Sequence, residues 1–182
     1  MNSDTPIVSP PPKQDRVGGW LLVFVIIQVI TCVLAFRNLA AVPASFTVEG
    51  RNLQTAVPPF LAYVLFQVFA LLVKCVVPIV GLVLLFRRSH QAPVFFKVFL
   101  SFVILEGLIA LLAFPLLYPS LAAAFREAGD SLAPLEAARD AQFSSGLSKV
   151  GYGVVWLMYW FRSKKVARMF TVGVDEFSRV AT

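Results

Sequence analysis

Two ionisable side chains, Lys74 and Glu106, lie inside long apolar stretches of this sequence. Charged side chains within apolar helices are costly to bury, and they often mark ion or proton pathways or pair with one another. Lys74 lies 13 residues before Arg87, and Glu106 lies 13 residues after Pro93. On antiparallel helices joined by the basic segment 87–93, both side chains would lie about 20 Å from that turn. The sequence therefore predicts an intramembrane ion pair.

Small and polar residues recur beside both members of the predicted pair, and such residues belong at helix–helix contacts in lipid. We therefore expect the pair to face the interior of a helix bundle. One role is structural, fixing the packing of the two helices, and this role is favoured because the membrane interior would hold one Lys, one Glu and no His. The alternative is a proton or substrate relay. The small and polar neighbours are Gln67, Ala70, Pro78, Gly81, Ala110 and Ala113.

The composition indicates a multi-pass membrane protein. Of the 182 residues, 58% are hydrophobic and 14% are charged, against about 45–50% and 25% in soluble domains. This excludes a disordered chain and disfavours an ordinary soluble domain. The net charge of +6 suits basic cytoplasmic segments better than a nucleic-acid surface.

The sequence predicts an all-α fold with four transmembrane helices in one domain, residues 17–170. The first apolar run could also be a signal peptide, but its length and the lack of a clean cleavage site favour a membrane helix. Short surface helices at 121–128 and 134–143 are expected within the connection 118–146. A proline-rich tail (1–16) and a C-terminal tail (171–182) are predicted to be cytoplasmic, the first of them disordered. The predicted transmembrane helices cover residues 20–36, 60–86, 94–117 and 147–161.

The distribution of basic residues predicts the orientation. The two tails and the segment 87–97 carry ten Lys and Arg residues, whereas the two long connections, with Lys149 counted among them, carry five. The positive-inside rule places the first set in the cytoplasm. We therefore expect a cell inner-membrane protein with both termini cytoplasmic.

Matched depths lead to two further predictions. Cys32 and Cys75 are expected at equal depth as free thiols, and Gln28 is expected to reach Ser101 through an interhelical hydrogen bond.

His90, in the basic turn, is predicted to be solvated. Aromatic side chains at the helix ends are predicted to form an interfacial belt; they are Trp20, Trp156, Tyr159 and Trp160.

The segment after the last apolar stretch has the pattern of a basic amphipathic helix. Val166 and Phe170 recur at helical spacing opposite basic residues, so the segment could lie on anionic lipid headgroups. The alternative is a simple stop-transfer charge cluster. The predicted lipid contacts are Arg162, Lys164, Lys165 and Arg168.

No segment carries a P-loop, a GxSxG or HExxH motif, or a Cys/His metal spacing. We therefore predict no enzyme, no metal and no cofactor, and no nucleic-acid partner. The preferred function is a non-enzymatic one exerted through membrane or protein interaction, with a possible homo-oligomer. The alternative is a small transporter or transport subunit that uses Lys74 and Glu106.

Both ends of the apolar region carry motifs. Residues 18–21 read GGWL, residues 156–170 read WLMYWFRSKKVARMF, and residues 86–93 form the basic turn FRRSHQAP. In these features the chain resembles a bacterial inner-membrane family, domain of unknown function 2569. It departs from that family's pattern at Lys165 and Met169. The resemblance implies four helices over roughly residues 17–170, and it implies no activity.

Overall fold

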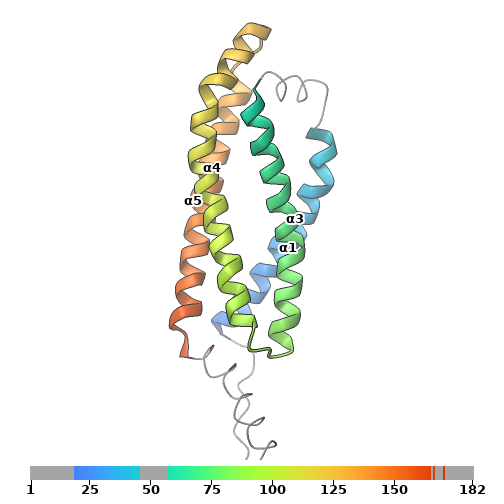
Figure 1. The fold of residues 1–182 in the computed structure, drawn as a ribbon, viewed down its shortest axis with the longest axis vertical. Coiled ribbons are helices and arrows are strands. Elements are labelled where there is room, and N and C mark those ends of the chain that lie inside the picture. Colours follow the sequence, from blue (N-terminus) through green and yellow to red (C-terminus); the bar gives the residue numbers. More distant parts are fainter. Residues whose placement is uncertain (1–18, 46–56, 165, 167–169, 171–182) are drawn as a thin grey trace, which may run out of the picture.

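The computed structural model describes residues 19–45, 57–164, 166 and 170. In this part of the chain four long helices follow one another, so the all-α prediction is confirmed (Figure 1). Among the described residues, α1, α3 and α4 are long and apolar enough to cross a membrane. The helices are α1 (Trp20–Ser45), α3 (Pro58–Phe86), α4 (Ala92–Ala128) and α5 (Ala133–Arg162).

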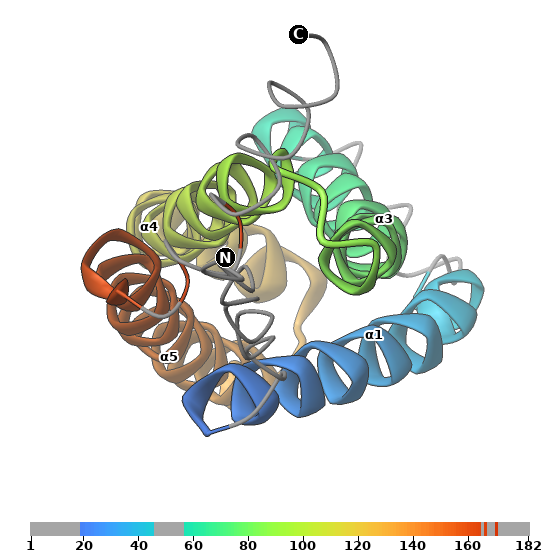
Figure 2. The same ribbon diagram turned by 90° about the horizontal axis from the view of Figure 1, so that it is seen from below.

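The helices form a bundle with two distinct ends. The start of α1, the turn between α3 and α4, and the end of α5 lie at the lower end of Figure 1. The α4–α5 turn and the start of α3 lie at the opposite end. Seen from below, α5 runs beside α4 while α1 lies beside α3 (Figure 2). The basic turn and the described chain ends therefore share one end of the bundle.

Local sequence explains where the helices begin and end. Proline stands in the first turn of α3, α4 and α5, where its missing N–H is no loss and its fixed φ suits a helix. Gly129 ends α4 in the left-handed region, with φ 75°. Its N–H donates to Arg126 and the N–H of Asp130 donates to Phe125, which satisfies free carbonyls at the helix end.

The helices α4 and α5 are longer than their apolar parts. They contain 37 and 30 residues, about 55 Å and 45 Å at 1.5 Å per residue, against a bilayer core of about 30 Å. The predicted surface helices 121–128 and 134–143 are not separate: the first is the end of α4 and the second the start of α5. Both segments are rich in alanine, so each long helix continues without interruption.

An aromatic cluster closes the lower end of the bundle. The ring of Phe24 lies 5.0 Å from that of Phe96 and 4.9 Å from that of Trp156, and Trp160 stacks on Phe96 at 5.0 Å. All four side chains are buried. The predicted interfacial belt is therefore wrong for the two tryptophans of α5, which point into the core, whereas Trp20 is exposed.

Apolar side chains also cover the outside of the bundle. Large exposed Leu, Val, Ile and Phe side chains occur on all four helices. Such extensive apolar surface is unusual for a soluble monomer and suits contact with lipid. The bundle thus combines an apolar exterior with the buried polar residues described next.

Candidate functional site

Glu106 stands at the centre of the bundle on the inner face of α4. Its side chain is fully buried, with 0% exposed. Its neighbour Gly107 meets Gly146 of α5 so closely that a Cβ at Gly107 would lie 2.8 Å from the Gly146 carbonyl oxygen. Small residues allow such backbone contact between membrane helices. The close approach brings the facing side chains of α5 to Glu106.

Lys74 of α3 reaches this carboxylate as predicted. Its Nζ donates to Oε1 of Glu106 at 2.7 Å. Pairing partly offsets the desolvation of both charges. The predicted ion pair between α3 and α4 is therefore present in the structure.

A second lysine, Lys149, completes the site. Its Nζ lies 2.8 Å from the same Oε1 atom of Glu106. Lys149 was not predicted to join the site, and its charge was assigned to an outer connection; this assignment is wrong, because Lys149 lies well inside α5, which begins at Ala133. The signal was present: Lys149 stands three residues after Gly146 and four before Gly153, a spacing that puts all three on one helix face.

These three side chains, which we call the central cluster, carry two formal positive charges and one negative charge. The carboxylate is sealed, whereas the Lys74 and Lys149 side chains keep 15% and 21% of their surface exposed. The second carboxylate oxygen, Oε2, is buried and has no hydrogen-bond partner. The central cluster therefore has a net charge of +1 and one unused acceptor.

Polar pairs flank the central cluster on both sides along the bundle. Tyr63 of α3 donates to Gln142 of α5 at 3.2 Å. Gln28 of α1 donates through Nε2 to the Tyr152 hydroxyl at 2.7 Å. Gln67 of α3 has a buried Nε2 without a partner. The interior is therefore polar over several helical turns.

Two matched-depth predictions had different outcomes. The Sγ of Cys32 donates to the carbonyl of Cys75 at 3.4 Å, and both cysteines are free, as predicted. The predicted bond between Gln28 and Ser101 is wrong. Ser101 is exposed and donates to the carbonyl of Lys97 on its own helix at 2.9 Å, a common arrangement for serine within helices.

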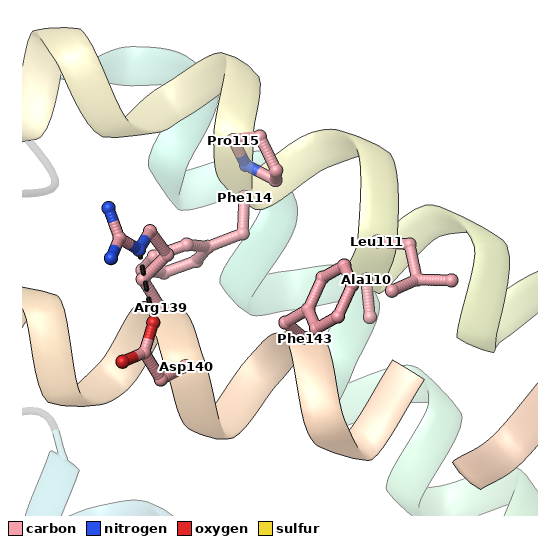
Figure 3. A pocket seen from close by; sticks show the side chains of 7 residues that line it. All are labelled: Ala110, Leu111, Phe114, Pro115, Arg139, Asp140 and Phe143. Atoms are coloured by element: carbon pink, nitrogen blue, oxygen red, sulfur yellow. Dashed lines mark hydrogen bonds and ion pairs between the residues drawn. The ribbon is translucent and has the colours of Figure 1, made fainter. Parts of the chain in front are cut away.

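A small pocket of about 110 Å³ lies between α4 and α5, near their shared turn (Figure 3). Arg139 bonds its neighbour Asp140 at 3.2 Å at the rim, and its guanidinium lies over the ring of Tyr118, 5.3 Å from the ring centre. Both charged side chains are largely exposed, and exposed pairs of this kind contribute little stability. The pocket is lined by Ala110, Leu111, Phe114, Pro115, Arg139, Asp140 and Phe143.

The lower end of the bundle holds the other predicted residues. His90 is exposed in the basic turn, as predicted. Arg162 and Lys164 are exposed, while Lys165 and Arg168 lie outside the described residues, as do the predicted tails 1–16 and 171–182. Val166 and Phe170 are buried against the aromatic cluster, so these two apolar side chains face the bundle. Among the described residues, no group of three His, Cys, Asp or Glu could hold a metal ion.

A helical bundle with an apolar exterior and a buried ion cluster defines the chain as a membrane-type protein. The family model described as "Protein of unknown function (DUF2569)" matches residues 14–171, and the chain belongs to this family. No curated protein and no solved structure matches the chain.

Proposed function

We propose that this chain is a four-span inner-membrane protein that acts without catalysis, through interactions within the membrane. The central cluster has a structural role and holds α3, α4 and α5 together. One observation carries this role: Glu106 is fully buried and is held by lysines from two other helices. A carboxylate enclosed in this way joins α3, α4 and α5, because removing it leaves two like charges facing each other.

The contacts of α5 support a fourth membrane crossing. This helix is less apolar than the other three, but two of its polar side chains are paired inside the bundle. Lys149 is neutralised by Glu106, and the Tyr152 hydroxyl accepts a bond from Gln28. Since α5 packs along α4, it would share the depth of that helix in a bilayer.

Charge distribution supports cytoplasmic termini. Moving Lys149 from the outer connection into α5 strengthens the excess of basic residues at the end that holds the basic turn. We expect a reporter that is active only in the cytoplasm to be active when fused after Thr182 and silent when fused near residue 130. If both fusions report the same side, the four-span proposal is wrong.

The proposed partners are anionic lipid headgroups and a second copy of the chain or another membrane protein. Arg162 and Lys164 are exposed just after α5, where they could meet the headgroups. The test measures how strongly the full chain, held in nanodiscs, binds to added vesicles with and without anionic lipid. An Arg162→Gln/Lys164→Gln variant that binds as strongly as the wild type would reject this contact.

A transport role is the second candidate, and the partial exposure of both lysines favours it. The deciding experiment is Lys149→Cys in a background with Cys32→Ser and Cys75→Ser, treated with a membrane-impermeant thiol reagent. Rapid labelling from one side would reveal a water-filled path to the central cluster and favour transport. Protection from both sides would favour the structural role. Leu147→Cys, on the exposed surface of α5, is the control for lipid-facing positions.

A further inference from the structure

The central cluster has one more positive than negative charge, and the described part of the apolar interior supplies no second carboxylate. The other acidic residues of α4 and α5 are exposed and lie toward the α4–α5 turn. From this imbalance we infer that the central cluster binds one small monovalent anion, held between the ammonium groups of Lys74 and Lys149.

The unused N–H donors of the two lysines support the proposed bound anion. An ammonium group has three N–H donors, and within the described part of the chain each lysine contacts a single acceptor, Oε1 of Glu106. These N–H groups need acceptors, and an anion supplies them together with the missing negative charge.

The geometry fits a ligand of one or a few atoms. The two Nζ atoms lie 2.7 Å and 2.8 Å from one oxygen, so they are no farther apart than the sum of these distances. A single ion can therefore contact both. Gly107 holds the backbones of α4 and α5 together beside Lys149, which leaves little room for a large ligand.

Charge and access favour a monovalent ion. The cluster has a surplus of one charge, and the Oε2 atom of Glu106 would repel a divalent anion more strongly than a monovalent one. The exposed surface belongs to the lysine side chains and not to the carboxylate. Chloride and a small carboxylate such as formate share the required chemistry.

The proposal is tested with the full chain purified in detergent at constant ionic strength. The 35Cl NMR line should broaden beyond that of a matched sample without protein, and chloride should raise the unfolding temperature relative to gluconate. A parallel measurement with formate in place of chloride shows which of the two anions the site prefers. A higher unfolding temperature with either ion supports the site, and no change with either ion overturns the proposal.

Variants distinguish this site from general salt effects. Lys149→Met should abolish the excess broadening, whereas Lys97→Met, at a lysine of α4 that lies over the Phe161 ring, should leave it unchanged. Glu106→Gln should tighten chloride binding at least about tenfold, because it removes a like charge beside the ion. Weaker binding in Glu106→Gln, or equal loss in Lys97→Met, would overturn the proposal even if one variant folds poorly.

Discussion

Replacing Glu106 with Gln is expected to destabilise the protein more than replacing either lysine. In the wild type both ammonium groups share Oε1 of this residue. The substitution leaves two half-buried positive charges that repel each other. Removing one partner of a buried pair costs about 3–5 kcal/mol, and here two lysines lose their partner together. The expected loss therefore lies at the upper end of that range.

Single lysine variants should be milder. After Lys74→Met, the carboxylate still pairs with Lys149, and the surplus of one positive charge in the central cluster disappears. The loss is one charge-assisted hydrogen bond, about 1.5–3 kcal/mol at most. Lys149→Met should behave alike, because the two contacts with Oε1 are nearly equal in length.

Combined variants separate a cluster of three from a simple pair. A pair would recover its stability in Lys74→Met/Glu106→Gln, since no charge would remain. The structure predicts only partial recovery, because Lys149 stays charged and alone. Adding Lys149→Met as a third substitution should restore most of the loss, since well-packed apolar replacements of buried ion groups are often neutral.

The assay is denaturant unfolding in detergent followed by tryptophan fluorescence, since Trp156 and Trp160 lie in the buried aromatic cluster. The reasoning is refuted if Glu106→Gln is no worse than Lys74→Met, or if the double variant recovers fully. If the variants show no measurable unfolding transition by fluorescence, the amount of each variant that accumulates in membranes is measured instead. These amounts should follow the same order as the expected stabilities, with Glu106→Gln the lowest of the single variants.

Two further predictions concern the helix contacts around the central cluster. Gly107→Ala should destabilise the bundle by about 1–3 kcal/mol, because the added Cβ meets the backbone of Gly146 at 2.8 Å. Gly151→Ala, whose Cβ meets nothing within 4 Å, should be neutral or stabilising in the same denaturant-unfolding assay, and equal effects would contradict the close packing. Tyr152→Phe should cost about 0.6–1.7 kcal/mol by leaving the buried amide of Gln28 without its partner, and a fluorescence unfolding curve identical to the wild type would refute this.

Depth along a helix could be predicted from the sequence, and this explains the correct predictions. Counting residues from the basic turn placed Lys74 at the depth of Glu106, and counting from Trp20 and from Arg87 placed Cys32 at the depth of Cys75; the structure has both pairs in contact. Depth does not determine which face of a helix a side chain occupies. Ser101 therefore lies on the outside of α4, although its depth matches that of Gln28.

Hydropathy identifies the apolar part of a helix but not its end. The segments on either side of Gly129 are polar enough to look like a connection, yet they continue α4 and α5 because their residues are good helix formers. The predicted last helix therefore began only at 147, so Lys149 lay two residues from its start and its charge was assigned to the outer connection. The glycines at 146 and 153 were the available signal for its inward position.

The aromatic residues illustrate a second limit. Tryptophan near a helix end is common at the membrane interface, but it also fills cores. The close packing of Phe24 and Phe96 around Trp156 and Trp160 depends on three helices meeting, which no single helix pattern contains. The sequence therefore predicted aromatic residues at the end of the last helix, but neither their place in the core nor their contacts with Phe24 and Phe96.

The most direct test of the central cluster is a solid-state NMR distance measurement on the protein in lipid bilayers. With 15Nζ-labelled lysine and 13Cδ-labelled glutamate, one carboxylate should show strong dephasing by two nitrogens at hydrogen-bond distance. That signal should disappear in Glu106→Gln and should weaken, without vanishing, in Lys74→Met and in Lys149→Met. Dephasing that survives Glu106→Gln, or that vanishes entirely in either lysine variant, would contradict a carboxylate shared by both lysines.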